Sequence, residues 1–174
     1  DMYLHMEAVA RAVLESGIRA NLSKSPLEFD RCGKRAVDNS KGCYEYFRKW
    51  NGKGNGRIKV YLEVHSAYLY DEERLKDAAG LARQCGTGIH IHILETARER
   101  KESIERYGMD PVEICHKCGI FDVPVIAAHC VHLSDENIRM LEEYGVNAVH
   151  NPSSNLKLGS GLARVPLMLD SGIN

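Results

Sequence analysis

The sequence predicts a parallel α/β fold, in which short apolar strands alternate with amphipathic helices. Two observations carry this prediction. Apolar residues recur at helical spacing in several segments, and many of these segments end at a glycine before the next apolar run begins. The predicted strands return at intervals of roughly 20 to 40 residues, which is typical of parallel β/α units.

The N-terminal half contains two predicted helices and two predicted strands. Apolar residues at helical spacing predict the first helix, and Gly17 ends it. The second helix is more weakly patterned. It ends in the glycine-rich run 51–56, which precedes a strand and is therefore expected to be a turn rather than a phosphate-binding loop. The elements expected here are a helix over residues 5–16, a strand over 18–22, a helix over 28–50 and a strand over 58–64.

The C-terminal half shows the same alternation with clearer helix starts. Asp71 and Ser134 are suitable N-cap residues, and Asp110-Pro111 followed by Glu113 is a good helix-start signal. Glycines follow most of these helices. The strands expected here cover residues 89–94, 125–128 and 146–149, and the helices cover 71–85, 98–107, 110–119, 134–144 and 160–171.

The composition excludes several classes of protein. Of 174 residues, 44% are hydrophobic, which is enough to bury a core. Lys and Arg total 23 against 24 Asp and Glu, so no basic field exists for a nucleic acid polymer or an anionic membrane. The longest apolar stretch, residues 123–128, is too short to span a bilayer, and the N-terminal residues show no signal-peptide pattern. We therefore expect one domain, or part of one, over residues 1–174, located in the cytoplasm and with neither a nucleic acid polymer nor a membrane as its partner.

The six cysteines indicate a reducing compartment, because a chain of this size needs no disulfides to fold. Only one CxxC pair occurs, Cys115 to Cys118, and it lies inside a predicted helix. Ordinary packing is the favoured interpretation, and a redox or metal role is the alternative. The cysteines are Cys32, Cys43, Cys85, Cys115, Cys118 and Cys130.

Histidines collect at the carboxyl ends of the predicted strands, the edge at which parallel β/α proteins bind ligands and carry out catalysis. A lone histidine there is best explained as a hydrogen-bonded core or rim residue. Four separate strand ends that each carry one favour a functional edge instead. His5 and His116 lie in predicted helices and fit a structural role. The four strand-end residues are His65, His92, His129 and His150.

The segment 89–95 (Ile-His-Ile-His-Ile-Leu-Glu) is the richest in candidate chemistry. Strand alternation places His90 and His92 on one face, and His92 is nearer the functional edge. Neutral imidazole binds Zn or Fe, and Glu95 can hold a proton near the water that a metal activates. The structural alternative is a core imidazole at His92 and a helix N-terminal carboxylate at Glu95.

Three motifs together resemble the metal-dependent amidohydrolase superfamily. They cover residues 89–95, 127–133 (Ala-Ala-His-Cys-Val-His-Leu) and 150–158 (His-Asn-Pro-Ser-Ser-Asn-Leu-Lys-Leu). The branch they are most similar to contains 5-methylthioadenosine/S-adenosylhomocysteine deaminases and their chlorohydrolase-like relatives. The likeness extends over the whole chain.

The resemblance implies a distorted (β/α)8 barrel of the TIM type with one divalent metal, Zn first and Fe as the alternative. His92 matches a metal ligand, Glu95 the acid/base that moves the proton, and His129 the residue that orients the attacking hydroxide. His65 and Asn155 match substrate contacts. The family's His-x-His pair of strand 1 and Asp of strand 8 have no counterpart here, so the chain is expected to be an incomplete barrel with about strands 3–7.

For the intact protein, the resemblance implies hydrolytic deamination of a 6-aminopurine nucleoside by a metal-activated water. The alternatives are deamination of guanine or another aminoheterocycle, dechlorination of a triazine, and a catalytically silent barrel that serves as a scaffold. The chain by itself is expected to be inactive, with an incomplete metal site. Its outer strands at 18–22 and 146–149 would expose unpaired edges, so we expect the isolated chain to self-associate. For the intact protein, we expect a homo-oligomer that acts on a small molecule.

Overall fold

A computed structural model describes residue 2 and residues 4–29 and 36–174. Its centre is a sheet in which every pairing is parallel, in the order β1-β4-β5-β6-β7. A separate antiparallel hairpin joins β2 to β3. The strands are β1 (Ala20–Lys24), β2 (Leu27–Phe29), β3 (Ala36–Asp38), β4 (Ile58–Ser66), β5 (Ile89–Ile93), β6 (Val125–His129) and β7 (Asn147–Val149).

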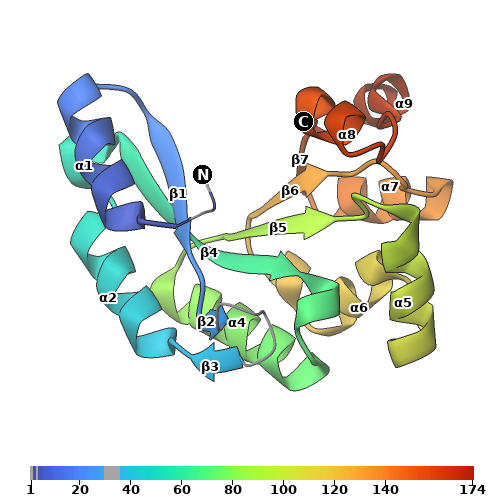
Figure 1. Ribbon diagram of the computed structural model, residues 1–174, viewed down its shortest axis with the longest axis horizontal. Helices are drawn as coiled ribbons and strands as arrows, with labels where there is room; N and C mark the ends of the chain where they lie inside the picture. Colours follow the sequence, from blue (N-terminus) through green and yellow to red (C-terminus); the bar gives the residue numbers. More distant parts are fainter. Residues whose placement is uncertain (1, 3, 30–35) are drawn as a thin grey trace.

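Helices connect successive strands of the sheet and pack along it. Figure 1 shows α1 and α2 beside β1, α4 and α6 below the middle strands, and α7 to α9 beside β7. None of the helices in the described residues is long and apolar enough to cross a membrane. The helices are α1 (Met6–Ser16), α2 (Ser40–Trp50), α3 (Lys53–Gly56), α4 (Glu72–Cys85), α5 (Ala97–Tyr107), α6 (Pro111–Lys117), α7 (Asp135–Glu143), α8 (Pro152–Lys157) and α9 (Val165–Asp170), with 3-10 turns η1 (Ala67–Leu69) and η2 (Ile120–Asp122).

The helix starts predicted from the sequence are confirmed by their hydrogen bonds. The Asp71 carboxylate accepts from the backbone N–H of Arg74, and Asp110 and Ser134 each form a capping box. Gly17 ends α1 with φ near 78°, in the left-handed region that favours glycine. The alternation of helix and strand therefore rests on local signals along most of the chain.

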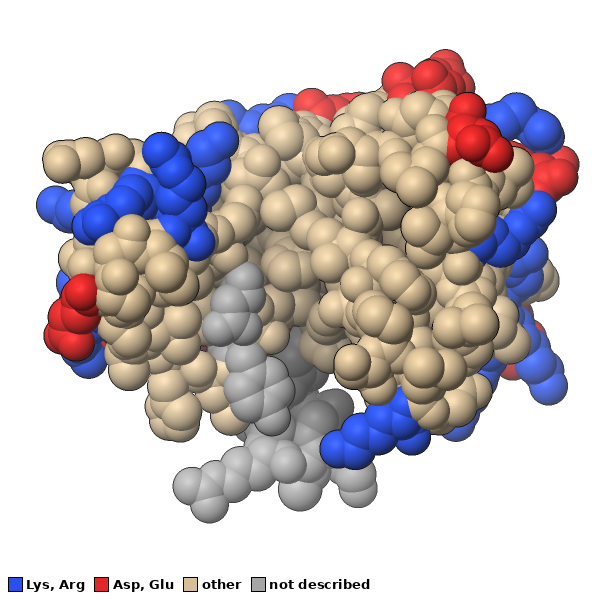
Figure 2. Space-filling view, turned by 90° about the horizontal axis from the view of Figure 1, so that it is seen from above, with Lys and Arg blue, Asp and Glu red and all other residues tan. Residues whose placement is uncertain are grey.

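The two faces of the sheet differ in chemistry. On β4, Ile58, Val60, Leu62 and Val64 are fully buried against the helices, and the isoleucines of β5 behave in the same way. The residues between them point to the other face, which is polar and only half-buried. Seen from above the view of Figure 1, charged side chains lie mainly at the margins of the molecule and not at its centre (Figure 2). The helix-facing side therefore supplies most of the core, and the opposite face is free to carry chemistry.

Three expectations about the elements are corrected. The strand expected at 18–22 lies at 20–24, and Ile18 is 57% exposed. The helix expected over 28–50 begins only at Ser40, because Leu27–Phe29 pairs with Ala36–Asp38 and the Asp38 carboxylate accepts from the Ser40 N–H. Residues 30–35 of that expected helix lie outside the described residues.

The third correction concerns the C-terminal segment, where one helix was expected over 160–171. The structure has α8 from Pro152 and a short α9 from Val165 instead. Proline is tolerated in the first turn of a helix, where its missing N–H leaves no bond unmade. Pro152 and Pro166 each lie in such a first turn, so each marks a separate start.

Burial of β5 predicts how strongly its core positions stabilise the fold. Ile91 is fully buried, so Ile91→Ala removes apolar contacts and leaves a cavity. We expect the free energy of unfolding to fall by about 2–5 kcal/mol, measured by urea denaturation. Ile104 on α5 is 51% exposed, and Ile104→Ala should change the free energy by only about 0.5 kcal/mol. Equal effects of the two variants would contradict the placement of β5 in the core.

Candidate active site

Parallel pairing brings three of the predicted histidines together. The carboxyl ends of β4, β5 and β6 lie at one edge of the sheet, and His65, His92 and His129 lie at or near these ends. The ring centroids of His65 and His92 are 4.7 Å apart, and those of His92 and His129 are 5.1 Å apart. These rings therefore form one cluster, although their residues are far apart in the sequence.

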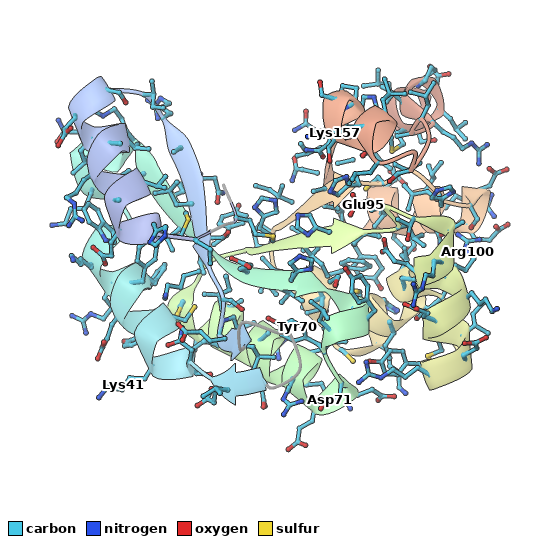
Figure 3. All side chains as sticks on the ribbon, viewed as in Figure 1. Lys41, Tyr70, Asp71, Glu95, Arg100 and Lys157 are labelled. Atoms are coloured by element: carbon cyan, nitrogen blue, oxygen red, sulfur yellow. The ribbon has the colours of Figure 1, made fainter. Side chains whose placement is uncertain are left out.

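Glu95 joins this cluster from the loop that follows β5. Figure 3 shows it just beyond the end of that strand. Its Oε2 lies 3.7 Å from Nε2 of His129, and the two side chains are 21% and 9% exposed. This distance is longer than a hydrogen bond and short enough for both side chains to contact one small group. The pair therefore offers a carboxylate and an imidazole to the same small group.

Asn155 lies behind His129 rather than open to solvent. It is fully buried in α8, and its Oδ1 is 2.8 Å from Nδ1 of His129. An amide oxygen can only accept, so Nδ1 donates, and the Nε2 of a neutral His129 ring carries its lone pair toward Glu95. Asn151 adds a second contact, because its side-chain oxygen accepts from the backbone N–H of His129 at 3.1 Å. The segment after β7 thus fixes both the ring and the backbone of His129.

Unusual backbone conformations occur at the same edge. Leu94, His129 and Cys130 have φ values of 48°, 74° and 51°. These values lie in the left-handed region, which residues other than glycine rarely adopt. The Cys130 N–H donates to Ile93 at 3.0 Å, and the Val131 N–H donates to Leu94 at 3.1 Å. These bonds tie the end of β5 to the end of β6. Such strain often occurs at functional sites, where the surrounding structure holds it in place.

Burial favours the neutral form of His92 and of His65. It lowers the pKa of His92 to about 3, with further lowering from the neighbouring rings of His65 and His129. Burial also lowers the pKa of His65 below its usual range. A neutral imidazole has a free lone pair, which is the form that binds zinc or iron.

The described residues alone do not complete a metal site. Among them, no group of three His, Cys, Asp or Glu side chains is arranged to hold an ion. His92 can serve as one neutral metal ligand. A complete site would need further ligands from outside the described residues. The donor set present therefore fits part of a metal centre.

Other residues singled out in the sequence lie outside this cluster. His150 follows β7 and is exposed. His116 contacts the Tyr144 hydroxyl at 2.7 Å, which is a structural role. Cys115 and Cys118 are buried, and the described cysteines are all free, in agreement with ordinary packing. Cys32 lies outside the described residues.

Sequence patterns gave no sign of one polar network that supports the site. Arg100 on α5 donates through Nη2 to the backbone oxygen of His132 at 2.8 Å and to Asn137 at 2.9 Å, and its Nε lies 3.2 Å from the Asp110 carboxylate (Figure 3). His132 in turn contacts the Ser160 backbone oxygen at 2.8 Å. The network joins α5, α6 and α7 to the loop after His129. Its members are too far apart in sequence for any spacing rule to connect them.

A cavity of about 450 Å³ lies beside the end of β1. Its wall includes Lys24, Glu28, Asn39 and Glu63. Glu63 occupies the polar face of β4, in register with His90 of β5. Burial raises the pKa of the Glu63 carboxyl to about 7, and the Lys24 ammonium opposes this shift. Glu63 has no signal in the sequence, because an isolated acidic residue in a strand forms no distinctive pattern.

Comparisons with known proteins concern the family and the fold. The sequence model of the amidohydrolase family matches residues 1–174. A 5-methylthioadenosine/S-adenosylhomocysteine deaminase of Acetivibrio thermocellus is 59% identical over the whole of this chain, which covers 40% of that protein. This chain therefore spans well under half the length of that relative.

Solved structures show the same fold. A guanine deaminase from C. acetobutylicum with bound guanine superposes with a TM-score of 0.82 at 26% identity, over 97% of this chain and 41% of that one. An adenosine deaminase from Xanthomonas campestris with bound zinc gives a TM-score of 0.84 at 24% identity, over 98% and 39%. With five parallel strands and this coverage, the expected incomplete barrel is confirmed.

The raised pKa of Glu63 predicts a pH-dependent change in stability. Because the folded pKa, about 7, lies above the unfolded value of 4.5, the folded state binds more protons between these pH values. The Glu63 carboxyl therefore destabilises the fold increasingly as pH rises through this window. We expect Glu63→Gln to gain roughly 1–3 kcal/mol relative to the unmodified protein between pH 5 and pH 8, measured by urea denaturation. A difference that does not change with pH would contradict the burial of this carboxyl.

Proposed function

The chain belongs to the amidohydrolase family, and we propose that it forms the central part, residues 1–174, of a longer enzyme that deaminates a 6-aminopurine nucleoside by hydrolysis. One observation carries this proposal. Glu95 and His129 face one point, beside the neutral rings of His92 and His65, at the carboxyl edge of a parallel sheet. The 59% identity to a deaminase of methylthioadenosine and S-adenosylhomocysteine supports this class of substrate.

A divalent cation, zinc first and iron as the alternative, would be held in part by His92. When bound, it supplies the Lewis acidity that makes water nucleophilic at neutral pH. The neutral state of the His92 ring supports this role, because a protonated imidazole cannot act as a ligand. The remaining ligands would come from parts of the longer protein outside this chain.

Glu95 and His129 would handle the protons. The Glu95 carboxylate would accept a proton from the attacking water and deliver it to the ring nitrogen beside the attacked carbon. Nε2 of His129 would accept a hydrogen bond from the same water and so orient it. Asn155 would act through His129, since its contact with Nδ1 fixes the ring in the form whose Nε2 is an acceptor. His65 would contact the substrate ring from the neighbouring strand.

Guanine is the second candidate substrate, and the guanine bound in the structurally similar deaminase favours it. The two substrates differ in where the ring carries its amino group. An enzyme would discriminate between them through contacts around the ring and through contacts with the sugar and its substituent, which only the nucleoside has. Both reactions would use the same proton transfers by Glu95, so the substrate has to be identified by direct assay.

We also propose the cytoplasm as the location and a homo-oligomer as the working form of the longer protein. The free cysteines in the described part of the chain support a reducing compartment. A catalytically silent scaffold is the non-enzymatic alternative. The approach of Glu95 to His129 argues against it, because a scaffold gains nothing from a half-buried carboxylate beside a histidine.

The proton-transfer role of Glu95 predicts a large loss of activity on removal of its charge. In the full-length protein, Glu95→Gln should lower kcat/KM for the best substrate by at least about 10²-fold, because an amide cannot accept the proton. Ammonia release would be measured with methylthioadenosine, S-adenosylhomocysteine, adenosine, guanine and a chlorotriazine. We expect the nucleosides with a sulfur-linked tail to be the best substrates.

A matched control is Glu105→Gln on α5, whose side chain is 63% exposed and should not affect the reaction. Activity that survives in Glu95→Gln at the level of this control would remove Glu95 from the mechanism. Turnover of guanine but of no nucleoside would instead select the second candidate. No turnover of any compound by a zinc-loaded protein would favour the scaffold.

The incomplete donor set predicts the behaviour of the isolated chain. A purified protein of residues 1–174 should bind zinc only weakly and release no ammonia, because the described residues contain no group of three metal ligands. Equilibrium dialysis and the ammonia assay would measure both. One tightly bound zinc per chain together with ammonia release would contradict the prediction.

A further inference from the structure

Strand β4 is irregular at its carboxyl end, next to the candidate active site. Val64 pairs with Ile91 of β5. Ser66, two residues further along β4, pairs with the very next residue of β5, His92. His65 is therefore the extra residue of a bulge. Regular alternation would send the side chains of His65 and Ser66 to opposite faces of the sheet, and a bulge can re-aim them.

The bulge brings the Ser66 hydroxyl into contact with the ring of His65. Its Oγ lies 3.2 Å from Nδ1 of that ring, which is a hydrogen-bond distance. Ser66 is fully buried, so bulk water does not compete for this bond. The His65 ring also packs edge-on against the ring of His92, with the centroids 4.7 Å apart. A buried hydroxyl and a neighbouring ring thus hold His65 in place.

Tyr68 approaches the same pair from the turn η1. Its ring lies edge-on to that of His65, with the centroids 6.3 Å apart. Burial raises the pKa of the Tyr68 hydroxyl, which therefore keeps its proton, and this hydroxyl has a side-chain hydrogen bond with Ser66. The Tyr68 hydroxyl, the Ser66 hydroxyl and Nδ1 of His65 thus form one chain of hydrogen-bonding groups.

The chemistry of these three groups sets the direction of their hydrogen bonds. A phenol is a stronger donor than an aliphatic hydroxyl, and the lone pair of a neutral imidazole is the strongest acceptor of the three. Hydrogen bonds that run in one direction also strengthen one another. Tyr68 therefore donates to Ser66, and Ser66 donates its only hydroxyl proton to Nδ1 of His65. The proton of the neutral His65 ring then lies on Nε2.

We propose that Ser66, oriented by Tyr68, is a positioning residue that holds His65 in the tautomer with its proton on Nε2. In this form, His65 offers an N–H donor to a bound ligand. The ring nitrogens of a purine carry lone pairs that accept such a bond. The contact with the purine rests on the proposed function, whereas the tautomer of His65 does not.

The tautomer is tested by NMR of the zinc-loaded full-length protein, labelled with nitrogen-15 at its histidines. The variant His65→Gln identifies the signals of His65. We expect a neutral ring with its proton on Nε2. In Ser66→Ala, Nδ1 loses its donor, and the signals should move toward a mixture of both tautomers. The matched control is Tyr144→Phe, which removes a hydroxyl 2.7 Å from a ring nitrogen of His116 and should leave the His65 signals unchanged.

A second variant, Tyr68→Phe, keeps the aromatic ring and removes only the hydroxyl. It should move the His65 signals in the same direction as Ser66→Ala and by less, and it serves as the test if Ser66→Ala does not fold. A proton on Nδ1 in the unmodified protein would overturn the assigned direction. Signals of His65 that are the same in both variants as in the unmodified protein would overturn the positioning role.

The consequence for the substrate is tested by kinetics with the best nucleoside and with its 3-deaza and 7-deaza analogues, each of which lacks one ring acceptor. Ser66→Ala should lower kcat/KM for the nucleoside about 10-fold, mainly through KM, because a hydrogen bond to the ring is weakened. The loss should vanish for the analogue that lacks the accepting nitrogen. An equal loss with all three compounds would overturn the donation to the ring. Absence of deaminase activity would count against the proposed function alone, because the NMR result does not depend on turnover.

Discussion

The parallel register of β4, β5 and β6 is the constraint on which the rest of the structure depends. It pairs Ser66 with His92 and Ile93 with His129. This brings His65, His92 and His129 to one edge and places Glu95 in the turn beyond it. A shift of one residue in β5 would move both of its histidines to the helix-facing side. The buried isoleucines of β5 oppose that shift, because it would move them out of the core.

Support for the candidate active site comes from segments outside the strands. Asn151 and Asn155 hold His129 from the segment after β7, and Arg100 holds the loop after His129 from α5. The left-handed backbone at His129 persists because these contacts determine the position of the chain on both sides of it. The chemistry proposed for Glu95 therefore depends on residues that touch neither the substrate nor a metal.

Much of the fold could be predicted from sequence, because its signals are local. Asp71, Asp110 and Ser134 mark helix starts through their own side-chain hydrogen bonds. The strand-end histidines could be found because parallel strands end at a common edge. The contact between Asn155 and His129 and the contacts of Arg100 could not, because each depends on packing between distant segments. The helix predicted over 28–50 was wrong in its first part for a related reason. The pairing of Leu27–Phe29 with Ala36–Asp38 takes the place of the helix that the weak pattern suggested there.

The most direct test of the convergence of these residues is a crystal structure of the full-length protein. The bound ligand would be an analogue of the tetrahedral intermediate of 6-aminopurine nucleoside deamination. We predict that the new hydroxyl at the attacked carbon lies about 2.6–3.2 Å from both the Glu95 carboxylate and Nε2 of His129. An analogue bound at this edge with either side chain well beyond hydrogen-bond reach, or bound elsewhere in the protein, would contradict a single catalytic site built from β4, β5 and β6.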